Sequence, residues 1–156
     1  MTLEDLREAQ QGLAGIAVRT PLVDMPELAT LTGVPVYLKL ESRQPTGAFK
    51  LRGAWTALRR LPPEQRARGV ITYSSGNHGQ ALAYAAQRMG VRAVIVMPET
   101  ATRTKVEGVK RWAGEVVLAG TTSEQRYEKA AALARSDGLT VIPPFDHRDV
   151  IAGQAP

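Results

Sequence analysis

The sequence contains no cysteine, which excludes disulfide bonds and thiolate metal sites. The absence agrees with a reducing compartment, and we expect a cytoplasmic protein. Histidine is almost as scarce, with His78 and His147 alone, so we do not expect a zinc site. No run of about 18 apolar residues occurs, so we expect no membrane-spanning segment. The polar and charged residues 1–10 do not resemble a secretory signal.

Aromatic residues make up only 5% of the chain, and this bears on the meaning of its net charge of +5. The basic residues are scattered and alternate with acidic ones, as on a solvated surface. A nucleic-acid interface would instead need a basic patch with aromatic side chains for stacking. We therefore expect no nucleic-acid partner, and the positive charge is equally suited to attracting an anionic metabolite.

The sequence is rich in short apolar runs that alternate with helical patterns. With 156 residues and 44% hydrophobic content, the chain can form about one domain with its own core. The runs predict buried strands, and the stretches between them predict helices. We expect strands at residues 36–40, 70–73, 93–97, 115–118 and 140–142, and helices at about 48–61, 79–89, 102–112 and 123–136. Such alternation predicts an α/β fold with a parallel sheet.

Capping residues mark several of the expected helix ends. Ser123 is suited to cap the last of these helices. Gly90, Gly114 and Gly138 follow helical stretches, where a left-handed residue commonly ends a helix.

The remaining segments are less regular. Residues 3–16 predict an amphipathic helix, and residues 19–22 predict an extended stretch because Pro21 restricts the residue before it. Residues 61–69, with two adjacent prolines, predict a linker.

Lys50 lies among small and apolar residues in the segment 46–54, TGAFKLRGA, near the start of a predicted helix. A lysine in such surroundings titrates at a lower pH and becomes able to form a Schiff base with an aldehyde. The alternative is an ordinary solvated surface charge, which we expect for Lys39, Lys105, Lys110 and Lys129.

A second segment, residues 74–79 (SSGNHG), follows the predicted strand 70–73 and opens a helix. Ligands bind at such strand ends in parallel sheets, and amides at a helix start hold carboxylates or phosphates. The alternative is a polar turn in which a serine or Asn77 caps the helix and His78 packs on the surface. The segment is neither a dinucleotide-binding nor a Walker motif, and the chain contains no G-x-S-x-G nucleophile elbow.

Together the two segments resemble those of the threonine dehydratase/serine racemase family, which are pyridoxal-phosphate enzymes of fold type II. Residues 96–98, Gly120 and residues 151–154 also match, so the resemblance covers nearly the whole chain. It implies pyridoxal 5'-phosphate as the cofactor. It also implies a tryptophan synthase β-like fold, with an open parallel sheet and helices on both faces.

The resemblance implies a role for each residue of the two segments. Lys50 matches the lysine that holds the cofactor as a Schiff base, Phe49 the residue beside the pyridine ring, and Asn77 the residue bonded to its 3'-hydroxyl. The loop that grips the substrate carboxylate is matched by Ser74, Ser75, Gly76, Asn77 and His78. Ser75 also matches the serine that faces the opposite side of Cα in the racemases, so we count it with Lys50 as catalytic.

The implied reaction is a β-elimination that converts L-threonine or L-serine into a 2-oxo acid and ammonia. Two alternatives stay open. The first is an amino-acid racemase of the same family, and the second is a non-catalytic fragment that only folds or pairs with a partner. The family relationship also implies a homo-oligomer, a dimer or a tetramer, for the full-length protein.

Two departures from the family pattern lead us to expect a truncated, N-terminal half of such an enzyme. No two glycines are adjacent, so the glycine-rich loop for the cofactor phosphate is absent, and Ala155 and Pro156 stand where the family continues with Gly-Thr. We expect residues 1–68 to belong to a large domain that carries Lys50. Residues 69–147 should form a small α/β domain and residues 148–156 the return to the large one. The isolated chain should then have little or no activity.

Overall fold

A computed structural model describes residues 1–74 and 76–155, so Ser75 lies outside the described residues. Its centre is a four-stranded sheet in the order β5-β4-β3-β6, in which all neighbouring strands are parallel. The strands are β3 (Val70–Tyr73), β4 (Ala93–Met97), β5 (Glu115–Leu118) and β6 (Thr140–Val141). Four of the five predicted strands therefore form this sheet, with β6 one residue shorter than expected.

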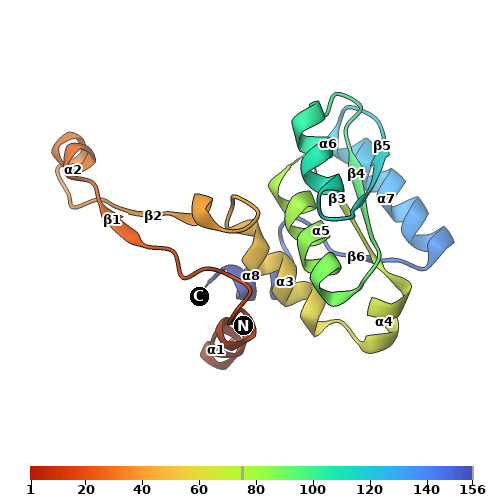
Figure 1. Ribbon diagram of the computed structural model, residues 1–156, viewed down its shortest axis with the longest axis horizontal. Coiled ribbons are helices and arrows are strands. Elements are labelled where there is room, and N and C mark those ends of the chain that lie inside the picture. The colour runs from red at the N-terminus through yellow and green to blue at the C-terminus, as the bar shows by residue number, and fades with distance from the viewer. Residues whose placement is uncertain (75, 156) are drawn as a thin grey trace.

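Helices cover both faces of this sheet, as Figure 1 shows. Successive side chains of β4 point to opposite faces. Ile95 and Met97 pack in the core on the side of α5 (Asn77–Met89). Val94 and Val96 pack with Ala130 of α7 (Ser123–Asp137) on the other side. The expected open parallel sheet with helices on both faces is confirmed.

Helix α3 (Lys50–Arg60) lies against both α5 and α8 (Arg148–Gln154). Every residue of α3 from Leu51 to Leu58 is buried, because its side chains are small or apolar on all sides apart from Arg52 and Thr56. Two glycines allow α3 and α8 to approach closely. A Cβ on Gly53 would lie 2.7 Å from the Val150 carbonyl oxygen, and one on Gly153 would lie 2.5 Å from the Arg52 carbonyl oxygen.

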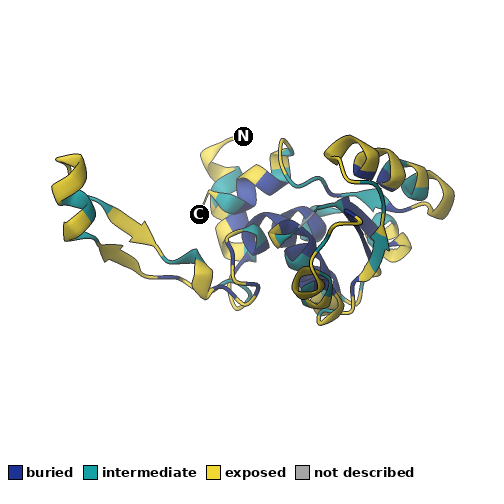
Figure 2. Cartoon of the chain, turned by 90° about the horizontal axis from the view of Figure 1, so that it is seen from above, coloured by how far each residue is buried: buried dark blue, intermediate teal, exposed yellow. Residues whose placement is uncertain are grey.

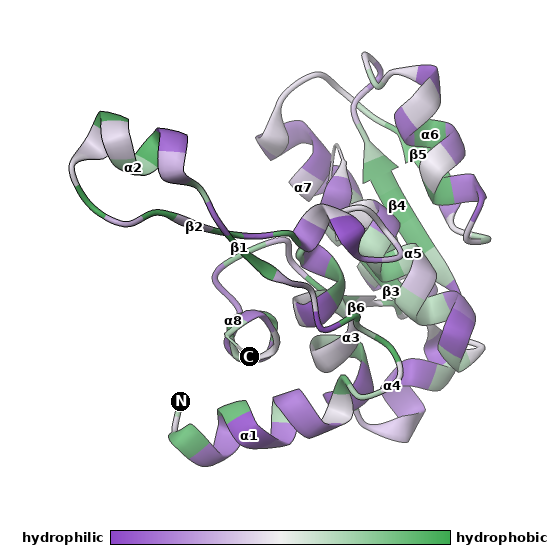
Figure 3. Ribbon diagram, turned by 60° about the vertical axis from the view of Figure 1, so that its left-hand side comes forward, coloured by the Kyte–Doolittle hydropathy of each residue, from purple (hydrophilic) through white to green (hydrophobic). Residues whose placement is uncertain are grey.

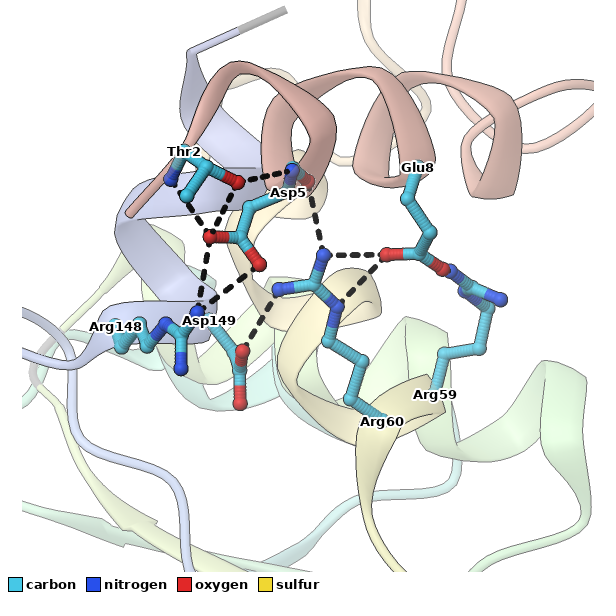
Figure 4. Close-up of polar contacts among 7 residues, drawn as sticks. All are labelled: Thr2, Asp5, Glu8, Arg59, Arg60, Arg148 and Asp149. Atoms are coloured by element: carbon cyan, nitrogen blue, oxygen red, sulfur yellow. Dashed lines mark hydrogen bonds and ion pairs between the residues drawn. The ribbon is translucent and has the colours of Figure 1, made fainter.

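Ion pairs attach the N-terminal helix α1 (Leu3–Gly12) to α3 and α8 (Figure 4). Arg60 pairs with Glu8 on one side and with Asp149, at 2.8 Å, on the other. Asp5 completes a capping box with Thr2 and pairs with Arg148 at 2.9 Å. The helix ends earlier than the expected residue 16.

The segment between α1 and α3 projects from the body as an arm, residues 21–40, in Figures 1 and 2. Its strands β1 (Leu22–Asp24) and β2 (Tyr37–Lys39) pair antiparallel, and α2 (Pro26–Thr32) lies at its tip. The predicted strand at 36–40 is therefore present, but the expectation that it is buried and parallel is wrong, because β2 is exposed and pairs antiparallel with β1. The prediction relied on the apolar residues of this segment, coloured green in Figure 3. Hydrophobicity alone does not determine whether a strand lies in the core.

A buried polar network fixes the base of the arm to α3. The Arg52 guanidinium donates two hydrogen bonds to Glu41, of 2.8 and 2.9 Å, from the short 3-10 helix η1 (Glu41–Arg43). Thr20 donates a further bond to the same carboxylate. Gln44 bonds both the amide and the carbonyl of Val18. The pKa of Glu41 falls from 4.5 to about 2, mainly because of Arg52.

Two further details of the secondary structure differ from expectation. Residues Pro63–Arg68 form helix α4 where we expected a linker. Proline is accommodated at the first helical position, because the amide that it lacks would have no partner there. Thr122, rather than Ser123, caps α7 through a capping box with Gln125.

The predicted helix-ending glycines are confirmed at two positions. Gly90 and Gly138 have φ values of 66° and 69°. The third prediction is wrong: α6 (Arg103–Lys110) has Arg111 as its C-cap, and the residue with a positive φ after it is Ala113 rather than Gly114. Gly114 instead provides space, since a Cβ there would lie 2.6 Å from Val109.

Within residues 1–74 and 76–155, no helix is both long and apolar enough to cross a bilayer. The same residues contain no cluster of three or more metal-ligating side chains.

The close crossing of α3 and α8 predicts that Gly153→Ala destabilises the chain. The added methyl group would meet backbone and force the helices apart, so we expect a loss of about 1–3 kcal/mol in the free energy of unfolding, measured by urea denaturation. Gly108→Ala on α6 is the matched control, because its methyl group would meet only the flexible end of Gln80. Equal stability of the two variants would contradict the tight crossing.

The lowered pKa of Glu41 predicts a specific acid sensitivity. A carboxylate with a depressed pKa stabilises the fold above its unfolded pKa, and this contribution is lost as the pH falls from 4.5 towards 2. Glu41→Gln should cost about 1–3 kcal/mol at pH 7, and the deficit should shrink steadily below pH 4.5. Urea denaturation as a function of pH measures this, with Glu27→Gln at the exposed arm tip as the control. A deficit that does not change with pH would refute the assignment.

Candidate active site

Lys50 is placed by a tight turn that precedes α3. Gly47 adopts a φ of 71°, and its amide donates a 2.8 Å hydrogen bond to the Gln44 carbonyl. The chain then enters α3 at Lys50, the first helical residue. The Lys50 Nζ donates a 2.7 Å hydrogen bond to the carbonyl oxygen of Pro144, which lies 94 residues away in sequence. The fold therefore brings the lysine to the segment that follows β6.

The surroundings of Lys50 shift its titration towards the neutral amine. Partial burial lowers the pKa of Lys50 below the ordinary value of 10.5, because the protein replaces part of the water that would solvate the ammonium. The Nζ also lies 5.2 Å from the ring centroid of Phe49. Phe49 is 44% exposed, so an aromatic residue that solvent can reach lies beside the amine. The shift moves Lys50 towards the neutral form, in which an amine acts as a nucleophile and proton acceptor.

The second predicted segment leaves β3 and enters α5. The Ser74 amide continues the ladder by donating to the Val96 carbonyl, and the Gly76 amide bonds the Ser74 hydroxyl at 3.3 Å. Helix α5 begins at Asn77, which is exposed. Its first amides have no acceptor within the helix, and the helix dipole adds positive potential there. A Cβ on Gly76 would meet nothing within 4 Å, so the approach to these amides is open.

This start of α5 corrects one sequence-based alternative. The N-cap residue is Gly76, which has no side chain, so neither Ser74 nor Asn77 occupies the N-cap position. Gly79 serves packing, because a Cβ there would lie 2.7 Å from Ile95 of β4. The helix start thus lies against the sheet, and no side chain of residues 1–74 or 76–155 caps its amides.

His78 is buried, with only 2% of its surface exposed, so the alternative that it packs on the surface is wrong. Its Nε2 lies 3.2 Å from the carbonyl oxygen of Ile142. Burial lowers the pKa of His78 to about 4, and the positive charge of Lys50 acts in the same direction. The imidazole is therefore neutral near pH 7. A ligand at the helix start can therefore reach the backbone amide of His78 but not its buried ring.

The structure brings the two segments together at residues 142–144. Lys50 bonds the carbonyl of Pro144, and His78 contacts the carbonyl of Ile142. Lys50 and Phe49 come from the start of α3, whereas Ser74, Gly76, Asn77 and His78 come from the start of α5. Sequence reasoning missed residues 142–144, because backbone carbonyls carry no side-chain signal. Two adjacent prolines at the end of a predicted strand were the only indication.

The family model described as "Pyridoxal-phosphate dependent enzyme" matches residues 14–156. The chain belongs to this family. The sequence-based recognition of a pyridoxal-phosphate enzyme, and of its fold, is confirmed. The individual roles assigned to the site residues remain predictions.

Relatives with assigned names support a more specific comparison. The chain is 41% identical over 154 residues to an L-threonine ammonia-lyase of Thermotoga maritima, covering 99% of this chain and 38% of the relative. It is 48% identical over 139 residues to a biosynthetic L-threonine dehydratase of Pasteurella multocida, covering 89% of this chain and 27% of the relative. The structure of maize serine racemase superposes with a TM-score of 0.91 at 35% identity, covering 97% of this chain and 46% of that one. The chain thus spans less than half the length of these relatives.

The site predicts an unusual titration of Lys50. In the folded chain, its ε-amine should titrate below 10.5, and in urea it should return to that value because the desolvation is lost. Reductive ¹³C-methylation followed by an NMR pH titration measures this, with Lys50→Arg identifying the resonance. Identical folded and unfolded values would contradict the described environment.

Proposed function

We propose that this chain supplies the lysine and the carboxylate-binding loop of a pyridoxal-phosphate-dependent ammonia-lyase. The substrate would be a small hydroxy amino acid, L-threonine or L-serine, and the products a 2-oxo acid and ammonia. The observation that carries the proposal is the partly desolvated Lys50 amine, held by the Pro144 carbonyl close to the amino end of α5. The names of the dehydratase relatives favour this reaction.

The residues present fit the cofactor. Lys50 offers an amine with a lowered pKa for covalent attachment to an aldehyde, and Phe49 offers an exposed aromatic ring beside it. To Asn77, which is exposed at the start of α5, we assign the bond to the 3'-hydroxyl. When bound, the cofactor withdraws electrons from the substrate Cα and so makes its proton acidic.

Lys50 then acts as the base. As a neutral amine it accepts the Cα proton at Nζ, and burial favours this state by lowering its pKa. The β-hydroxyl departs with a proton as water, and one water is consumed when ammonia is released. The net reaction therefore converts one hydroxy amino acid into one 2-oxo acid and one ammonia.

The amino end of α5 would bind the substrate carboxylate. The amides of Asn77, His78 and Gly79 have no acceptor within the helix, and Gly76 leaves the approach open. A carboxylate at this position is stabilised by the helix dipole as well as by the hydrogen bonds. The Ser74 hydroxyl, at the end of β3, is available beside it.

We assign residues 1–68 to a large domain, residues 69–147 to a small α/β domain and residues 148–156 to the return to the large one. The division is favoured by the parallel sheet, since its four strands β3 to β6 all lie within residues 69–147. The family relationship also favours a homo-oligomer for the protein as the cell produces it.

Racemisation is the second candidate function, favoured by the close superposition on maize serine racemase. It needs a proton donor on the opposite face of Cα, and we assign that role to Ser75, which lies outside the described residues. Chiral chromatography of the remaining amino acid separates the two activities. Accumulation of the D-enantiomer, lost in Ser75→Ala, would support racemisation.

The proposed attachment site predicts the outcome of a trapping experiment. Incubation with pyridoxal phosphate followed by borohydride should place a phosphopyridoxyl group on Lys50, located by peptide mass spectrometry. Lys50→Ala should abolish this label together with the release of 2-oxo acid from threonine or serine, measured in the protein as the cell produces it. Lys105→Ala, at an exposed position on α6, is the matched control and should leave both unchanged. Unaltered turnover in Lys50→Ala would refute the proposal.

A further inference from the structure

Residues 142–144 connect two parts of the site that are remote in sequence. The Ile142 carbonyl lies 3.2 Å from His78 Nε2, and the Pro144 carbonyl accepts the Lys50 amine at 2.7 Å. The segment is itself anchored, because the Ile142 amide donates a 2.9 Å hydrogen bond to the Ile71 carbonyl of β3. The Ile142 side chain is 1% exposed and belongs to the main core. One end of the segment is therefore fixed to the sheet.

Two consecutive prolines stiffen this segment. Proline fixes φ and has no amide hydrogen, so neither Pro143 nor Pro144 leaves a donor without a partner in this partly buried position. Their carbonyls remain available as acceptors. A stiff segment with free carbonyls is suited to hold neighbouring donors at set positions.

His78 can contact Ile142 in only one way. A carbonyl oxygen accepts hydrogen bonds but cannot donate them, so Nε2 must carry a proton. Because the ring is neutral near pH 7, Nδ1 then carries none. Among the described residues Nδ1 has no hydrogen-bond partner. The buried ring thus makes one directional bond, from the second residue of α5 to the segment that also holds Lys50.

We propose that residues 142–144 act as a positioning segment, in which the Ile142 carbonyl fixes the start of α5 through His78 and the Pro144 carbonyl holds the free amine of Lys50. This inference rests on the proposed function and assigns the His78 side chain a positioning role without substrate contact. This positioning fixes where the Lys50 amine lies relative to the amides that bind the carboxylate. A small displacement of the base from the substrate lowers the reaction rate strongly, since a shift of about 1 Å can reduce it by about 100-fold.

A pair of substitutions at His78 tests the directional bond. The amide nitrogen of glutamine reaches the position of Nε2, whereas that of asparagine reaches only the position of Nδ1. With the holoenzyme, His78→Gln should keep KM for the amino acid within about threefold of the original, and His78→Asn should raise it by about tenfold or more while lowering kcat. Urea denaturation verifies that both variants are folded. Equal KM values for the original protein and His78→Asn would overturn the proposal, as would loss of binding in both variants, which would indicate direct substrate contact by the ring.

A second measurement needs neither a variant nor the cofactor. Side-chain ¹⁵N NMR of the chain at pH 6–8 should show a neutral His78 with the proton on Nε2. The Nδ1 tautomer or a charged ring would overturn the proposal. The tautomer of His78 tests the positioning role of residues 142–144. The trapping experiment at Lys50 tests the proposed function independently, so failure of one can be told from failure of the other.

Discussion

The close crossing of α3 and α8 is the constraint on which the position of Lys50 depends. Gly53 and Gly153 let the two backbones approach until no Cβ fits between them. Helix α3 is consequently buried along most of its length, and its first residue cannot shift without moving its neighbours. The ion pairs of Arg60 with Glu8 and Asp149 add α1 to the same assembly. The Lys50 side chain is thus carried by the first residue of a helix that is buried from Leu51 to Leu58.

The same helix also holds the arm. Arg52 lies two residues after Lys50, and its paired hydrogen bonds to Glu41 fix the chain where the arm leaves the body. This pair and the turn at Gly47 determine the direction in which the chain enters α3. The amine on one side and the arm on the other are therefore connected through a single turn of helix. Because that turn is buried, we expect substitutions in α3 to affect the positions of both the Lys50 amine and the arm.

The sequence predicted the parallel sheet because β3, β4 and β5 are short, apolar and separated by helical patterns. It failed for residues 36–40, since an apolar run does not reveal whether its partner lies in the core or in a projecting hairpin. It also identified Lys50 and the loop before α5 from residue types suited to an aldehyde and an anion. The buried ring of His78 was not predictable, because burial of a helix-start residue depends on what packs over it.

Local chemistry was therefore determined by the sequence alone: an amine among small and apolar residues, and a glycine-containing turn at a helix start. Their meeting was decided only by the tertiary structure. Lys50, His78 and residues 142–144 are distant along the chain, and they come together because β6 pairs with β3 and places the following carbonyls beside both side chains. Backbone carbonyls occur at every residue, so only the folded geometry can show which of them serve the site.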